Sequence, residues 1–139
     1  MTTNESLTEY NNFYEYGTGK NDPFDNAKDF VTMPWTIEIA GEVAKPGVYD
    51  IEDLLRPHQM EERVYRHRCV ETWSMVVPWA GVALADIIKR LEPTSRAKYD
   101  AFETLHDPKR MSGQNRSVLP WPYVEGLRRA EAMHTLTAR

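Results

Sequence analysis

Cys69 is the only cysteine among the 139 residues of the chain. A single thiol cannot close an internal disulfide, so the fold has to be stabilised by a hydrophobic core, and the length is sufficient for one. Hydrophobic residues make up 41% of the chain and charged residues 27%, which is typical of a globular rather than a disordered protein. We therefore expect one domain over residues 1–139, with residues 1–9 flexible.

The charge balance and the apolar pattern argue against nucleic-acid binding, a membrane-spanning segment and an export signal. Seventeen basic residues stand against 21 acidic ones, and no basic stripe with interleaved aromatic residues is present, so nucleic-acid binding is not expected. No apolar run approaches the roughly 18 residues that a membrane-spanning helix needs. The N-terminal residues have neither the basic n-region nor the apolar h-region of a signal peptide. The sequence thus predicts no transmembrane segment and no export signal in this chain.

The apolar pattern predicts short strands alternating with short helices. Strands are predicted where apolar and polar residues alternate, and helices where apolar residues recur with the helical period. The predicted strands are Trp35–Gly41, a short one from Val48, Glu62–Cys69 and Lys98–Leu105; the predicted helices are Asp50–Leu55, Ala83–Leu91 and Arg128–Met133. Loops are predicted for residues 1–34, Pro78–Val82 and residues 106–122. The fold class is therefore α+β, a mixed β-sheet with short helices and long loops.

The residues before Cys69 suggest that its sulfur is chemically active. Arg66, His67 and Arg68 directly precede it, and in an extended strand His67 would share its face. Neighbouring positive charge favours the thiolate, the form that attacks electrophiles and binds metals. A thiolate is a soft ligand, which suits a soft transition metal. The alternative is that Cys69 is a small buried hydrophobic residue, as most free cysteines are.

Two other chemistries for the same residue remain open. The four histidines are His58, His67, His106 and His134. Only His67 lies close to Cys69, and no Cys-x-x-Cys or His-x-x-x-His pair is present, so the spacing does not favour a structural zinc site. A thiol enzyme with Cys69 as nucleophile and a histidine as base is compatible with the residue types, but many proteins meet that test.

A cluster of asparagine, tyrosine and glutamate at residues 10–16 is the second candidate site. Asparagine and tyrosine both donate and accept hydrogen bonds, so the cluster suits a ligand rich in heteroatoms, such as a pterin. The alternative is a tyrosine-rich loop that packs on the core.

Several runs of the chain, in order, resemble one family. They are YNNFYE (10–15), IAGEVAKP (39–46), RCVETWSMVVPW (68–79), EPTS (92–95), YDAFET (99–104) and PYVEGLR (122–128). These runs resemble the catalytic subunits of bacterial periplasmic protein-methionine-sulfoxide reductases, which belong to the sulfite-oxidase-fold group of molybdopterin oxidoreductases. The resemblance extends from about Tyr10 to Thr137.

The resemblance implies a molybdenum-molybdopterin cofactor in which one pterin dithiolene and one protein cysteine, here Cys69, hold the metal. Its other implied cofactor contacts are Asn11, Tyr14, Glu15 and Thr104. The implied reaction is oxygen-atom transfer, in which reduced molybdenum accepts the oxygen of methionine sulfoxide in an oxidised protein. A membrane haem-binding subunit is the implied electron donor, and the implied location is the periplasm. Cationic neighbours of Cys69 would offset the negative charge of such a site.

The chain also departs from the family pattern. Family members carry a twin-arginine export signal and continue well beyond residue 139, where further cofactor-binding residues lie. Residues Ser112–Pro120 stand in place of a longer glycine-bearing loop. We therefore expect a domain cut short at its C-terminus. The alternatives are an inactive remnant without cofactor, in which Cys69 is a free thiol, and an enzyme with sulfite-oxidase-like activity.

Overall fold

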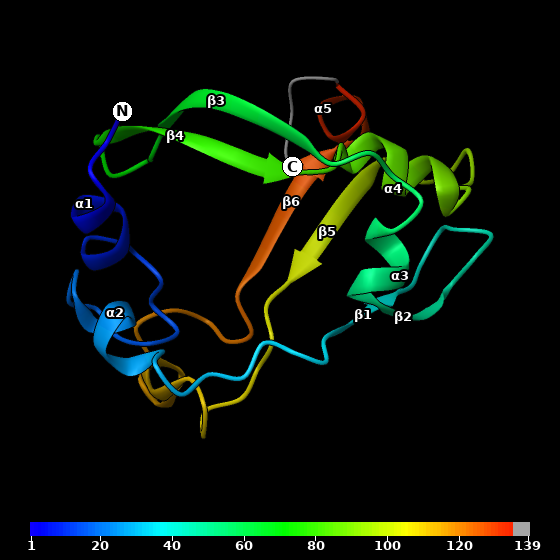
Figure 1. Cartoon of the computed structure of the whole chain (residues 1–139). Coiled ribbons are helices and arrows are strands. Elements are labelled where there is room, and N and C mark those ends of the chain that lie inside the picture. The colour runs from blue at the N-terminus through cyan, green and yellow to red at the C-terminus, as the bar shows by residue number, and fades with distance from the viewer. Residues whose placement is uncertain (135–139) are drawn as a thin grey trace. The chain divides into compact units, whose positions relative to one another are not determined.

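The computed structural model describes residues 1–134 (Figure 1). The helices are α1 (Asn4–Glu9), α2 (Asp22–Asn26), α3 (Ile51–Leu55), α4 (Leu84–Arg90) and α5 (Arg129–Ala132), together with a short 3-10 helix, η1 (Ser112–Asn115). The strands are β1 (Thr36–Ile39), β2 (Gly47–Asp50), β3 (Glu61–Arg68), β4 (Ser74–Gly81), β5 (Tyr99–Glu103) and β6 (Val124–Arg128). The α+β class predicted from the sequence is confirmed.

Within residues 1–134 the strands pair two by two, as β1–β2, β3–β4 and β5–β6. Strands β1 and β2 are antiparallel, with Thr36 opposite Asp50 and Ile39 opposite Gly47. Strands β5 and β6 also run in opposite directions (Figure 1). A short turn joins β3 to β4, which places the residues between Arg68 and Ser74 at one end of a hairpin.

The contacts of the chain divide it into two compact units. The first unit consists of Met1–Val31, Arg66–Val77 and Phe102–Glu125, and the second consists of Thr32–Tyr65, Pro78–Ala101 and the chain from Gly126 onward. All the site residues predicted from the sequence lie in the first unit. Our prediction of one domain over residues 1–139 stays a prediction.

The second unit contains most of the buried apolar side chains. They are Leu54, Val82, Ala85, Ile88, Leu91 and Ala132. Helix α4 presents Ala85 and Ile88 to this core, while Asp86 and Lys89 on its other face form an ion pair of 3.0 Å. This amphipathic pattern is the one that predicted the helix from the sequence, and the prediction is confirmed.

The first unit is built from loops and short helices. Helix η1 lies against the backbone of Tyr14–Gly17, and the Gly113 amide donates to the Glu15 carbonyl at 2.7 Å. The buried Gln114 side chain holds its own loop, accepting from the Asp107 amide and donating to the Leu105 carbonyl, both at 2.7 Å. Few apolar side chains are buried here, so hydrogen bonds between loops contribute much of the order.

Three of the sequence predictions about local structure are wrong. Residues 1–34 contain α1 and α2; Thr3 caps α1 by accepting from the Ser6 amide, and Pro23 lies in the first turn of α2. Residues Pro78–Val82, predicted as a loop, belong largely to β4. Strand β6 was missed because its side chains are nearly all exposed, so it lacks the alternation that reveals a half-buried strand. Residues 1–9, predicted to be flexible, contain α1; their mobility stays a prediction.

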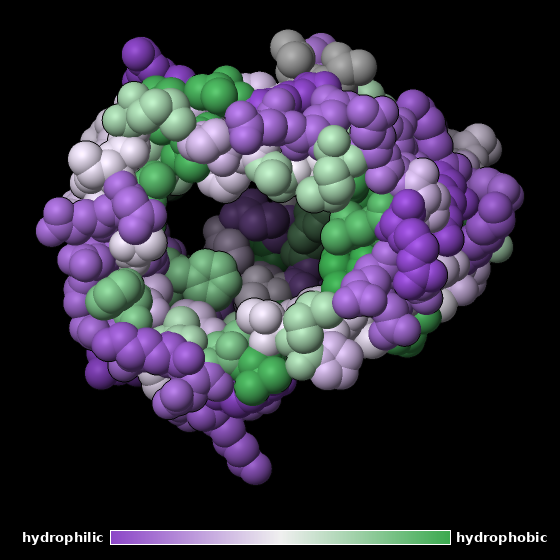
Figure 2. Space-filling model, in the orientation of Figure 1, coloured by the Kyte–Doolittle hydropathy of each residue, from purple (hydrophilic) through white to green (hydrophobic). Residues whose placement is uncertain are grey.

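The surface carries apolar side chains among polar ones, as the green areas of Figure 2 show. Large exposed apolar residues include Val31, Val48, Val64, Val70 and Tyr99. No helix within residues 1–134 has the length and apolar character needed to cross a membrane.

Candidate functional site

Cys69 lies in the turn that joins β3 to β4. Its amide donates to the Trp73 carbonyl at 3.0 Å, and its carbonyl accepts from the Thr72 amide at 3.1 Å. Thr72 has a φ of 75°, an unusual conformation for a β-branched residue. The strand predicted to end at Cys69 ends one residue earlier, at Arg68, so Cys69 lies in the turn rather than in β3. Backbone strain of this kind is concentrated at functional sites, which fits a turn built to present a side chain.

The Cys69 sulfur has one side-chain hydrogen-bond contact in the described structure. The Asn12 amide nitrogen lies 3.8 Å from Sγ, within reach of a weak N–H···S hydrogen bond. Asn12 comes from the aromatic loop of the first unit, 57 positions earlier in the chain. The sequence prediction named its neighbour Asn11 and missed Asn12. In an irregular loop no periodicity tells which of two adjacent asparagines faces the site.

A hydrogen-bonded network extends from Asn12 to Tyr14. The Tyr14 hydroxyl donates to Glu71 Oε1 at 2.6 Å, and the Lys20 ammonium donates to Glu71 Oε2 at 2.6 Å. The same ammonium donates to Asn12 Oδ1. Tyr14, Glu71, Lys20, Asn12 and Cys69 thus form one continuous chain of polar contacts. Tyr14 was predicted from the sequence, whereas Lys20 and Glu71 were not.

The network shifts the pKa of each ionisable member in a consistent direction. The hydrogen bond from Lys20, and then that from Tyr14, holds the pKa of Glu71 below its usual value. The hydrogen bond from Lys20 to Glu71 raises the pKa of Lys20. The separate hydrogen bond from Tyr14 to Glu71 is the largest cause of the raised pKa of Tyr14. Glu71 is therefore ionised, Lys20 is protonated and Tyr14 is neutral at physiological pH.

These shifts predict how stability depends on pH. Because the pKa of Glu71 is lower in the folded protein than its usual 4.5, its contribution to stability is present above pH 4.5 and is lost as the pH falls through the folded value. Thermal unfolding of wild type and Glu71→Gln should differ most at neutral pH, with the wild type more stable, and the difference should shrink as the pH falls below 4.5 and Glu71 becomes protonated. A difference that stays constant from neutral to acid pH would contradict the assigned ion pair.

The other predicted contacts have local roles in the structure. The Asn11 side chain accepts from the Phe13 amide at 3.2 Å, which closes a turn in the aromatic loop. Glu15 is buried, with 6% of its surface exposed, and its carbonyl is the acceptor for Gly113. The Thr104 amide donates to the Tyr123 carbonyl at 2.9 Å. These residues share the first unit with Cys69, and their roles as cofactor contacts stay predictions.

The aromatic loop also packs on itself, which was the alternative interpretation of this cluster. Tyr16 is buried, its ring stacks on Phe13 at 5.7 Å between centroids, and Phe30 meets it edge-on at 6.0 Å. Arg110 lies over the Phe30 ring at 5.1 Å. The loop therefore has a packed aromatic side, and its polar residues Asn12 and Tyr14 contact the Cys69 turn.

The donor groups around the turn fit an anionic ligand that brings its own metal ligands. Arg66, His67 and Arg68 are exposed beside Cys69. The indole nitrogen of Trp73 is buried and has no hydrogen-bond partner among residues 1–134, so it can donate to a ligand. No group of three or more His, Cys, Asp or Glu side chains that could hold a metal occurs in this part of the chain. A single thiolate with surrounding donors suits a metal whose remaining ligands come from a cofactor.

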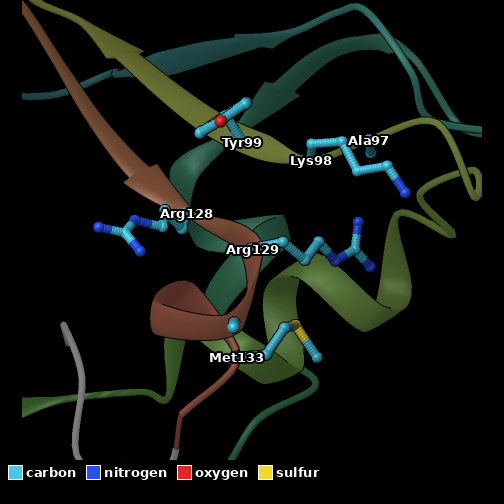
Figure 3. A pocket seen from close by; sticks show the side chains of 7 residues that line it. Ala97, Lys98, Tyr99, Arg128, Arg129 and Met133 are labelled. Atoms are coloured by element: carbon cyan, nitrogen blue, oxygen red, sulfur yellow. The ribbon is translucent and has the colours of Figure 1, made fainter.

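A pocket in the second unit is separate from these residues. Its volume is about 600 Å³, and its lining consists of Ala97, Lys98, Tyr99, Arg128, Arg129, Ala130 and Met133. Figure 3 shows that the Arg128 side chain extends to one side while those of Lys98 and Arg129 extend to the other. The three cations do not converge on one point, so the pocket lacks the form of an anion site.

Comparison with known proteins identifies the family. Residues 25–138 match the model of the oxidoreductase molybdopterin binding domain. The chain is 55% identical over 138 residues to a protein-methionine-sulfoxide reductase catalytic subunit MsrP of Pseudomonas syringae pv. tomato, which covers 98% of this chain and 41% of that protein. MsrP proteins of Xanthomonas campestris pv. campestris and Burkholderia mallei are 53% and 54% identical over 137 residues, covering 99% of this chain and 42% and 41% of those proteins.

The chain spans about two fifths of the length of these curated relatives. The match confirms the resemblance drawn from the sequence runs, and the molybdopterin named in the family's description agrees with the predicted cofactor. The matched region includes Cys69, Glu71 and Thr104. The chain belongs to the oxidoreductase molybdopterin-binding domain family.

Proposed function

We propose that this chain supplies the cysteine ligand and part of the binding site of a molybdenum-molybdopterin cofactor, in an enzyme that reduces methionine sulfoxide in proteins. The observation that carries the proposal is the position of Cys69, whose sulfur is presented by a strained turn and contacts Asn12 at the end of a polar network. The family match and the function named for the MsrP relatives support it.

In this proposal Cys69 is the protein ligand of molybdenum. Asn11, Tyr14, Glu15 and Thr104 contact the pterin, whose nitrogen and oxygen atoms can pair with amide, hydroxyl and carboxylate groups. The bound cofactor supplies oxygen-atom transfer from the sulfoxide together with the two electrons that this reduction consumes. The residues of the chain hold and orient it, and the cations beside Cys69 offset its negative charge.

The surroundings of the turn suit a macromolecular substrate. Val70, next to Cys69, is 96% exposed, so the turn is open to solvent within its own unit. A side chain on another protein has to reach the sulfur region from outside, and a deeply buried site would prevent this. The proposed partners are oxidised proteins and a membrane haem-binding electron donor, and the proposed location is the periplasm.

The test uses the chain produced in a bacterium that makes molybdopterin. The proposal predicts that the purified chain retains molybdenum. It also predicts that, with a reduced viologen dye as electron donor, the chain reduces methionine sulfoxide in an oxidised protein faster than it oxidises sulfite with ferricyanide. Oxidation of sulfite without reduction of sulfoxide would replace the proposal with a sulfite-oxidase-like function. A chain free of molybdenum would favour a remnant without cofactor.

A further inference from the structure

Lys20 stands at the centre of the network without touching the Cys69 sulfur. Its ammonium donates to Glu71 Oε2 at 2.6 Å and to Asn12 Oδ1, and lies 5.5 Å from the centre of the Tyr14 ring. The side chains of Lys20 and Glu71 are 31% and 29% exposed, so the pair is partly shielded from water. The Lys20 carbonyl accepts from the Asn11 amide at 3.1 Å, which ties its backbone to the segment that carries Asn12.

These contacts determine which way the Asn12 amide faces. An asparagine amide has an oxygen that only accepts and a nitrogen that only donates, and the two can exchange places by a half turn. A lysine ammonium has three donors and no acceptor, so Asn12 has to present its oxygen to Lys20. The nitrogen, 3.8 Å from Sγ, then has to point its N–H groups at Cys69. In the reversed orientation the oxygen would face the sulfur and the nitrogen would face a cation, and both contacts would be unfavourable.

We propose that Lys20 is a positioning residue, which orients the Asn12 amide so that it donates to the sulfur of Cys69. This inference rests on the proposed function, in which that sulfur is the molybdenum ligand. Glu71 and Tyr14 hold the ammonium in place, so the orientation of Asn12 is fixed before any metal arrives. Hydrogen bonds to ligand sulfurs are among the factors that set the reduction potential of a metal site, and outer-shell partners of metal ligands are typically worth about 10–100-fold in affinity or activity.

The orientation can be measured by NMR on the metal-free 139-residue chain. The observable is the nuclear Overhauser effect between the side-chain NH₂ protons of Asn12 and the β protons of Cys69, compared among wild type, Lys20→Met and Lys20→Arg. The effect should be present in wild type and retained in Lys20→Arg, whose guanidinium also only donates. In Lys20→Met it should fall by about half or more, because the amide can then adopt both orientations.

Two further variants complete the test. Lys28→Met is the matched control, because Lys28 lies in the same unit and pairs with Asp25 at 3.2 Å rather than with the network; it should leave the effect unchanged. Lys20→Gln serves if Lys20→Met loses its dispersed spectrum, since glutamine keeps a polar side chain of similar length but can also accept. An effect that stays at the wild-type level in Lys20→Met, or in Lys20→Gln if Lys20→Met does not fold, would overturn the proposal.

A chemical measurement tests whether Lys20 acts through Asn12. At one fixed pH, Lys20→Met should change the rate of Cys69 alkylation by iodoacetamide about twofold or more, as expected for coupled members of one network. In an Asn12→Leu background the same substitution should have almost no effect. Equal effects in both backgrounds would contradict a positioning role. Neither measurement needs the cofactor, so this inference and the proposed function can fail separately.

Discussion

Replacing Gly113 with alanine is expected to destabilise the first unit more than the same substitution at any other glycine of that unit. A Cβ at Gly113 would lie 2.1 Å from the Tyr14 carbonyl oxygen and 2.7 Å from the Gly17 amide nitrogen. Both are backbone atoms, so no flexible side chain can move aside. We expect a loss of about 3 kcal/mol in the free energy of unfolding, at the upper end of the usual cost of overpacking.

The expected loss in the free energy of unfolding is this large because η1 and the aromatic loop are in direct backbone contact. Relieving the clash requires the two segments to separate, which also breaks the 2.7 Å hydrogen bond from the Gly113 amide to Glu15. The cofactor contacts predicted at Tyr14 and Glu15 lie on that loop. Gly113→Ala should therefore also weaken molybdenum retention, although Gly113 forms no hydrogen bond with Cys69 in the described part of the chain.

Urea unfolding measures the loss, and Gly126→Ala is its matched control. The nearest atom to a Cβ at Gly126 is the Asp100 carbonyl oxygen at 3.9 Å, an ordinary contact. The control should change stability little, whereas Gly113→Ala should shift the urea midpoint strongly and accelerate exchange of the Gly17 amide proton. Equal midpoints for the two variants would contradict the close approach of η1 to the aromatic loop.

Replacing Cys69 with serine is expected to abolish molybdenum retention. The hydroxyl is similar in size to the thiol but stays protonated at neutral pH and is a poor ligand for a soft metal. Loss of outer-shell partners alone typically costs 10–100-fold, so removing the proposed protein ligand should lower the molybdenum content by more than about 100-fold. Elemental analysis of the purified chain, normalised to protein, measures this.

Ser74→Ala is the control for this variant. Ser74 is exposed at the start of β4, in the same hairpin as Cys69, and should leave the molybdenum content unchanged. Circular dichroism should show that both variants keep the wild-type secondary structure. Retention of molybdenum by Cys69→Ser at the wild-type level would show that another group holds the metal.

The elements that could be predicted from the sequence are those whose pattern reflects burial. Strand β1 alternates exposed and half-buried residues, and α4 buries one face, so each carries its own periodicity. Helices α1 and α2 bury almost no side chains, so the hydrophobic pattern does not reveal them. Their start signals, Thr3 and the Asn21–Pro23 turn, are short and also occur in loops, so they do not predict a helix by themselves. Strand β6 is exposed and carried no such signal.

The candidate site shows a similar division. Cys69 could be identified because a lone thiol among cations has a distinctive chemistry. Asn12, Lys20 and Glu71 could not, because their contacts join residues 51 and 57 positions apart, and no local pattern encodes such pairs. An Asn beside an Asn, or a Lys in a loop, is ordinary in sequence. Only the folded first unit shows that these side chains form one hydrogen-bonded network, which reaches the Cys69 sulfur through Asn12.

The central claim is that the Cys69 sulfur is a ligand of molybdenum in this chain. X-ray absorption spectroscopy at the molybdenum edge tests it most directly, because it counts the sulfur atoms bound to the metal. Three sulfur ligands are expected in the wild-type chain, two from the pterin dithiolene and one from Cys69. A molybdenum site with only two sulfur ligands would contradict it.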